Sequence, residues 1–321
     1  MSDNSSLITD RHVLLDDVAI SAVVALVGVF GLASNSAAIV AVMTNPVLKN
    51  AFGLLCLSHS IANFGVLLVF TCWVTPMTLI KSKLSSTLVG KLFGIVNIMF
   101  WDVCVYSHLA ISLNRLIAIT LPYRAAHLLT FQKTLILVGS AWFLGFCHVI
   151  AYFWTDVCFI YYEPKQWIWI FADTVCGHII SKFTDFYTTL AVLVIILILD
   201  CTTLFKLRMN NKVSSNQSSS SSDTVQQRRR NTEIRFFWQT LYQNALFFYE
   251  ISNFYYLCDL FGNQWAVFFT STFPWEICHA MDGMIIVLFH FRWSHIRRAP
   301  ANVNSTAAYS RRKPSDRNVT E

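Results

Sequence analysis

Residues 112–123, SLNRLIAITLPY, close a long apolar segment with an arginine and then a proline. Arg115 directly follows Asn114, and Pro122 ends the helical pattern because it has no backbone N–H to donate. A charge in the middle of a membrane helix costs about 2.5 to 3.5 kcal/mol on insertion scales. We therefore expect Arg115 to mark the edge of a bilayer and to take part in the function of the protein.

The composition is that of a membrane protein. Of the 321 residues, 55% are hydrophobic and 13% are charged, whereas about a quarter of the residues in soluble domains are charged. The sequence predicts an all-α membrane protein, a bundle of seven transmembrane helices, each long enough to cross about 30 Å of hydrocarbon. The seven segments run from about 18 to 43, 51 to 77, 88 to 120, 134 to 155, 183 to 205, 235 to 258 and 265 to 291.

Basic residues indicate the orientation of this bundle. Of the 24 lysines and arginines, 18 fall on the side that holds Arg115, and Lys and Arg collect on the cytoplasmic side of membranes. We therefore expect the N-terminus outside and the C-terminus in the cytoplasm. The expected parts are an extracellular tail (1–17) with a glycosylation sequon at Asn4, a membrane domain (18–291) and a basic cytoplasmic tail (292–321). The membrane domain includes an outer loop (about 156–182) and a disordered Ser-rich inner loop (about 207–234).

Four stretches of the sequence resemble a known family. They occur in order along the spans: GLASN (31–35), LSHSIAN (57–63), YSHLAISLNRLIAITLPY (106–123) and FPWEICHAMDGMIIVLF (273–289). Together they resemble the serpentine chemoreceptors of class x, a nematode branch of the G protein-coupled receptors. The resemblance implies a receptor in the plasma membrane of a sensory cilium. Such a receptor would bind a small environmental or pheromone-like molecule in its outer half and signal to a heterotrimeric G protein.

The inner end of helix three departs from the wider rhodopsin-like pattern. Where that pattern has an acid, an arginine and an aromatic residue, this chain has Asn114, Arg115 and Leu116. The carboxylate that would hold the arginine in the resting state is therefore missing from the motif. Glu233, at the cytoplasmic start of helix six, is the acid that we expect to replace it. The resemblance assigns G-protein coupling to Asn114, Arg115, Pro122 and Glu233.

Three polar residues are expected near the bilayer midplane. At about 1.5 Å per residue, Asp282 lies about 15 Å above Arg292, Asn63 lies about 18 Å above Ala51, and Asn35 falls near the same level. A buried aspartate needs a hydrogen-bond partner or a proton, and asparagine side chains can donate. Two interpretations stay open, a polar clasp that only fixes helix packing and a cluster that transmits the signal.

A second polar group is expected higher in the membrane, about 20 to 24 Å above the inner boundary. Ionisable residues inside a membrane are candidates for a functional site. They form either a ligand pocket between helices three, six and seven or a set of contacts that only hold helices together. The group consists of Asp102, Glu250, Trp275, Glu276 and His279, with His279 three residues after Glu276 and so on the same helix face.

The outer loop contains Cys158 and Cys176. In the receptor superfamily this loop is usually linked to the top of helix three, but the matching position in this chain is Gly90. We therefore expect a disulfide between Cys158 and Cys176, because the loop would face an oxidising space. The bond would order an aromatic lid over the mouth of the pocket.

Enzyme and transporter functions have less support in the sequence. The histidines show no HExxH or similar metal-binding spacing, and residues 265–291 contain no lysine for a retinal Schiff base. We find no internal repeat typical of transporters. A transporter or a non-signalling membrane protein is the alternative. We expect a chain that is not an enzyme, that contacts the lipid bilayer, and that needs no cofactor, metal or nucleic acid; dimerisation is left open.

Overall fold

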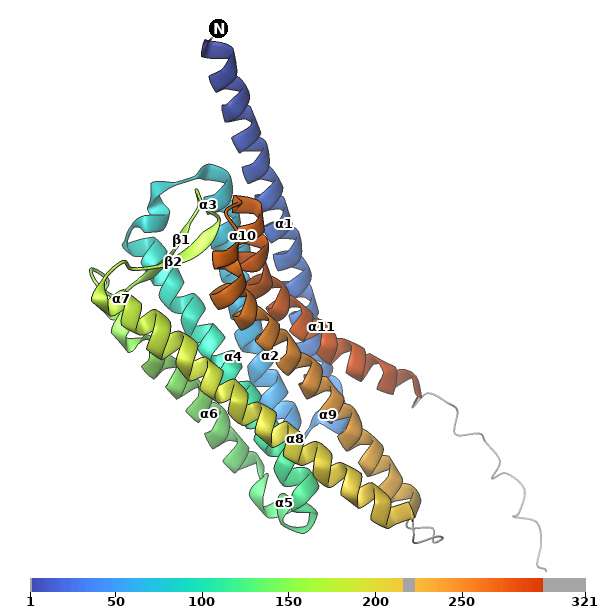
Figure 1. Ribbon diagram of the computed structural model, residues 1–321. Helices are drawn as coiled ribbons and strands as arrows, with labels where there is room; N and C mark the ends of the chain where they lie inside the picture. Colours follow the sequence, from blue (N-terminus) through green and yellow to red (C-terminus); the bar gives the residue numbers. More distant parts are fainter. Residues whose placement is uncertain (1, 216–222, 297–321) are drawn as a thin grey trace, which may run out of the picture.

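The computed structural model describes residues 2–215 and 223–296, with side chains from residue 14 onward except those of 210–215, 223–230, 232, 233, 259 and 291–296. Seven helical segments form an elongated bundle (Figure 1). The N-terminal half of α1 and a small hairpin lie at one end of this bundle, and α5 lies at the other. These are the outer and inner ends, respectively, in the orientation that the basic residues indicate.

Each predicted span corresponds to one helical segment, and several segments contain short 3-10 or π-helical turns. The first, third and fourth segments are α1 (Ser2–Thr44), α4 (Leu88–Thr120) and α6 (Phe131–His148) with η4 (Val149–Phe153). The second and fifth are α2 (Ala51–Val69), η2 (Phe70–Val74) and α3 (Thr75–Ile80), then α7 (Val175–Ile179), η5 (Ile180–Tyr187) and α8 (Thr188–Ser215). The sixth and seventh are α9 (Asp223–Ser252), η6 (Asn253–Leu257) and η7 (Cys258–Leu260), then α10 (Gln264–Thr270) and α11 (Thr272–Ile296).

Three of the connections between these segments contain a short helical element. They are η1 (Pro46–Leu48), η3 (Lys83–Ser86) and α5 (Pro122–Leu128). α4 ends at Thr120, and Pro122 is the first residue of α5. Proline is well suited to that first position, where a helix has no use for a backbone N–H.

The seventh segment lies in the interior of the bundle. Five segments of the described chain are long and apolar enough by composition to cross a membrane. α9 and α11 are more polar and complete the bundle by packing against the others, α11 against α1, α2 and α9. Of residues 272–290, only Leu288 is exposed. The ionisable residues between positions 272 and 290 therefore face protein and not lipid.

The helices extend beyond the boundaries expected from the sequence. α1 begins at Ser2 and so includes the segment expected as an extracellular tail, although the side chain of Asn4 lies outside the described residues. α8 continues to Ser215 and α9 begins at Asp223, both within the segment expected as a disordered loop. Once a helix is nucleated, each further residue adds a hydrogen bond, so a helix need not stop where its apolar residues end.

The outer end is covered by an antiparallel hairpin of β1 (Ile160–Glu163) and β2 (Ile168–Phe171). Cys158 and Cys176 flank this hairpin and form a disulfide, with their Cα atoms 5.3 Å apart. The Tyr162 hydroxyl lies 2.8 Å from Thr78 Oγ1 on α3. Burial raises the pKa of Tyr162, which keeps its hydroxyl neutral. The hairpin is thus tied to the fifth segment through Cys176 and to the second segment through Tyr162.

The hairpin also rests closely on α4 at Gly94. A Cβ atom there would lie 2.2 Å from the carbonyl oxygen of Ile160, whereas a Cβ at Gly139 on α6 would meet nothing within 4 Å. We expect Gly94→Ala to lower the free energy of unfolding by about 1 to 3 kcal/mol through overpacking. Gly139→Ala is the control and should be neutral or slightly stabilising. Equal thermal midpoints for the two variants in detergent would contradict this docking of the hairpin.

Candidate functional site

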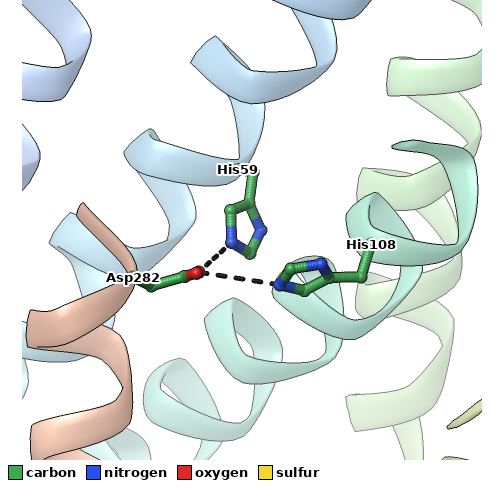
Figure 2. Close-up of side chains that lie close together, drawn as sticks. All are labelled: His59, His108 and Asp282. Carbon is green, nitrogen blue, oxygen red and sulfur yellow. Dashed lines mark hydrogen bonds and ion pairs between the residues drawn. The ribbon is translucent and has the colours of Figure 1, made fainter. Parts of the chain in front are cut away.

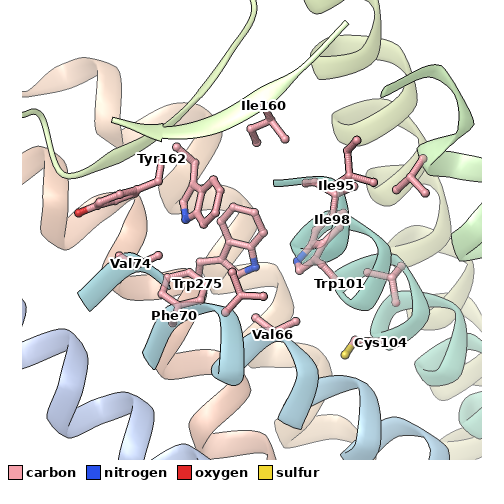
Figure 3. Close-up of a cluster of buried hydrophobic side chains, with 14 of the residues drawn as sticks. Val66, Phe70, Val74, Ile95, Ile98, Trp101, Cys104, Ile160, Tyr162 and Trp275 are labelled. Atoms are coloured by element: carbon pink, nitrogen blue, oxygen red, sulfur yellow. The ribbon is translucent and has the colours of Figure 1, made fainter. Parts of the chain in front are cut away.

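A small cavity lies in the outer half of the bundle, below the hairpin. Its wall comes from four helical segments and one strand, and it is lined by Ile98, Trp101, Phe171, Asp185, Glu250, Ile251, Phe254, Tyr255 and Trp275. Figure 3 shows Trp101 and Trp275 together in the buried cluster beneath Ile160. Their ring centroids are 6.4 Å apart in an edge-on arrangement, so the two indoles form a firm part of the wall.

Two carboxylates face this cavity. Trp101 Nε1 donates a hydrogen bond to Glu250 Oε1 at 2.8 Å, and the Tyr255 hydroxyl donates to Asp185 Oδ2 at 2.5 Å. Asp185 lies in η5 and Tyr255 in η6, both π-helical turns. A π-helical turn changes the direction of the side chains that follow it and is frequent at functional sites.

The structure separates the five residues that the sequence grouped as an outer pocket. Glu250 and Trp275 line the cavity, whereas Asp102 does not. His148 Nδ1 donates to Asp102 Oδ1 at 2.7 Å, so Asp102 faces the fourth helical segment. Because neighbouring helical residues point about 100° apart, Trp101 faces the cavity while Asp102 points to another helix.

Glu276 and His279 also lie outside the cavity wall. Glu276 is fully buried near α1, where a Cβ added at Gly28 would lie 3.0 Å from its Oε1. His279 Nδ1 donates to Asn63 Oδ1 at 2.5 Å and so belongs to the midplane group. Three residues along a helix lower a side chain by about 4.5 Å and rotate it by about 60°, enough to move His279 to a different set of neighbours.

The midplane cluster is centred on Asp282 of α11. His59 on α2 donates to Asp282 Oδ2, Asn63 Nδ2 donates to the same oxygen at 2.8 Å, and His108 Nε2 on α4 lies 3.6 Å from it. Figure 2 shows both imidazoles directed at the carboxylate from separate helices. Asn35 donates instead to the carbonyl oxygen of His279 at 3.0 Å. One carboxylate thus joins the second, third and seventh segments.

This cluster also has the donor atoms of a metal site. One ligand atom from each of His59, His108 and Asp282 lies within 4.8 Å of the others, and all three residues are buried. Two imidazole nitrogens and one carboxylate oxygen are a common ligand set for Zn²⁺. The bonds from His59 and Asn63 satisfy Asp282 Oδ2, whereas Asp282 Oδ1 and both ring nitrogens of His108 have no hydrogen-bond partner among the described residues. Sequence spacing missed the set because its members lie on three different helices.

At the inner end, Arg115 is 3% exposed and packs against aromatic rings. Its guanidinium carbon lies 3.7 Å from the ring centroid of Phe52 and 4.7 Å from that of Phe236. The Arg115 guanidinium also donates to Asn114 Oδ1 at 3.2 Å. The side chain of Glu233 lies outside the described residues. The contacts that the structure describes therefore link Arg115 to α2 and to α9 through rings.

Sequence reasoning missed several polar residues that the structure places inside the bundle, among them two histidines and two aspartates. His59 and His108 fall within quoted motifs but were considered only as members of a metalloenzyme pattern. Asp185 and Asp200 are acids in an apolar segment, and the rule for intramembrane acids would have found both. Asp200 is 3% exposed and accepts a hydrogen bond from Asn244 of α9.

The arrangement of the helices defines the class of the protein. The chain has the fold of squid rhodopsin, to which it is similar with a TM-score of 0.74 at 14% sequence identity, over 89% of this chain and 81% of that structure. The architecture is thus a bundle of seven transmembrane helices of the rhodopsin type. It places the chain among multi-pass membrane proteins.

The family is narrower than this fold. Residues 25–290 match the family model described as serpentine type 7TM GPCR chemoreceptor Srx, and the chain belongs to that family. Two similar proteins of Caenorhabditis elegans are serpentine receptor class X 45 (25% identity, 79% of this chain and 73% of that protein) and serpentine receptor class X-43 (25% identity, 86% and 85%). The chain is therefore a G protein-coupled receptor of the chemoreceptor type.

Proposed function

We propose that this receptor binds a small molecule in the outer cavity and signals to a heterotrimeric G protein at its inner end, in the plasma membrane of a sensory cell. The observation that carries the proposal is the cavity itself, which lies between Trp101, Glu250 and Trp275 and below a disulfide-linked hairpin.

The inner end supports the signalling half of the proposal. Arg115 and its rings contact helices two, three and six, so a change in helix six would change its surroundings. A ligand shifts such an equilibrium only if it binds one state more tightly than the other. The cavity wall includes Glu250 on α9, the same helix that carries Phe236 at its inner half. One rigid helix therefore connects the two sites.

Filling the cavity tests this function. We expect Ile251→Trp to raise the half-maximal ligand concentration more than tenfold, because the indole would occupy the space of the ligand. Ile198→Trp is the control, since Ile198 is 59% exposed on the outer surface of α8. The measurement is ligand-evoked calcium or cyclic-nucleotide change, at matched surface expression, in cells supplied with G proteins. Ile98→Phe adds a smaller group to the same wall if Trp prevents folding.

Two results would contradict the proposal. One is a wild-type dose response from both cavity variants at normal surface expression. The other is ligand-independent solute flux through the purified chain in liposomes without any G-protein response, which would favour the transporter alternative.

A further inference from the structure

The cavity contains two carboxylates that are each only half satisfied. Asp185 is 7% exposed and Glu250 is 4% exposed. Each uses one oxygen to accept a hydrogen bond from an aromatic donor, Tyr255 or Trp101. Asp185 Oδ1 and Glu250 Oε2 are buried and have no hydrogen-bond partner among the described residues. A buried acceptor without a donor is unfavourable. A ligand that donates hydrogen bonds to these two oxygens would therefore be bound favourably.

The remaining wall has no positive charge to balance these acids. Among the described residues that line the cavity, none is a lysine, an arginine or a histidine. Five of the lining residues are aromatic: Trp101, Phe171, Phe254, Tyr255 and Trp275. The faces of aromatic rings are electronegative and attract cations within about 6 Å of their centroids. The two acids and the aromatic rings therefore both favour a positively charged ligand.

We propose that the cavity binds a protonated amine with at least two N–H groups, an inference that rests on the proposed function. The N–H groups would donate to Asp185 Oδ1 and Glu250 Oε2, and the carbon skeleton would lie against the indoles of Trp101 and Trp275. An N–H donor is required because a quaternary ammonium would leave both oxygens unsatisfied. A carboxylate ligand is excluded because it would bring a further negative charge into a buried site without a base.

The positions of the two acids also make an amine suited to signalling. Asp185 lies in η5 of the fifth segment and Glu250 lies on α9 of the sixth. A protonated amine between them donates to both carboxyl groups and so links these two segments. The amine would therefore bind most tightly to the state in which the outer halves of the fifth and sixth segments are closest.

The test is a panel of ligands with matched carbon skeletons and different charges, added to the purified full chain in nanodiscs. Each carbon skeleton is present as an amine, an alcohol and a carboxylic acid, for example phenethylamine, phenethyl alcohol and phenylpropionic acid, together with 1,4-diaminobutane. The measurements are the thermal midpoint and the tryptophan fluorescence, because Trp101 and Trp275 line the site. We expect dose-dependent stabilisation by amines and none by the matched alcohols and acids.

Variants assign the effect to the two carboxylates. We expect Asp185→Asn and Glu250→Gln each to weaken amine binding more than tenfold. Asp200→Asn is the matched control, a buried acid on the same helical segment that does not line the cavity. Without ligand, the two cavity variants should be as stable as wild type or more stable, which separates ligand recognition from helix packing.

The outcomes distinguish this inference from the proposed function. Stabilisation by no amine of the panel, or by acids or alcohols as strongly as by amines, overturns the amine assignment. If an alcohol or acid evokes a G-protein response that Ile251→Trp abolishes, the receptor function stands and the amine assignment falls. If amines bind through Asp185 and Glu250 but no G protein responds, the amine assignment stands and the signalling proposal falls.

Discussion

Asp282→Ala is expected to lower the free energy of unfolding by about 2 kcal/mol, taking about 1 kcal/mol for each buried donor left without its acceptor. The donors are His59 and Asn63, and Asp282 is fully buried with His108 Nε2 at 3.6 Å. Water cannot replace the lost carboxylate at the middle of a bilayer. The second, third and seventh segments would then lose their common contact. Thermal unfolding of the purified chain in detergent measures the effect.

The structure offers a matched control for this variant. Asp173 lies 3.3 Å from His178 Nε2 and is fully exposed on the outer loop. Asp173→Ala removes the same kind of pair where water replaces the carboxylate, and it should leave the thermal midpoint unchanged. Asp282→Asn keeps one acceptor oxygen and should fall between wild type and Asp282→Ala. Equal midpoints for Asp282→Ala and Asp173→Ala would show that the midplane cluster does not hold the helices together.

Phe236→Leu is expected to raise basal signalling about fivefold at matched surface expression. Leucine keeps most of the apolar volume but removes the ring that faces Arg115, with loss of a cation–π contact of about 1 kcal/mol between helices three and six. We infer that this contact stabilises the resting arrangement, so its loss changes the equilibrium by about this factor. The measurement is G-protein activation without ligand.

A second aromatic contact of the inner end serves as the control. Arg235 lies over the ring of Phe289 at 5.9 Å, a longer contact between α9 and α11. Phe289→Leu should therefore change basal signalling less than Phe236→Leu. The same basal level in Phe236→Leu and wild type would rule out the ring contact as a resting-state restraint. Glu233→Gln tests separately the acid that the sequence proposed for Arg115.

Much of the fold was accessible from the sequence. Apolar segments of the right length predict helices because every backbone polar group in a bilayer must be satisfied within its own segment. The motif around Arg115 and three other stretches indicated the family that the comparison with known proteins also shows. Depth could be counted as well, at about 1.5 Å per residue, and Asn63 and Asp282, which were expected at one level, are in contact.

Only the tertiary structure decided which side chains face one another. Counting along a helix gives depth but not direction, because the rotation of each helix is set by its packing against all its neighbours. For this reason Asp102 faces His148, while Asp185, which the sequence analysis did not select, faces the cavity beside Glu250. Arg115 is a second residue whose depth, but not whose neighbours, could be inferred from the sequence. The sequence by itself determined that an arginine closes helix three, and the packing of α2 and α9 decided that two phenylalanine rings surround it.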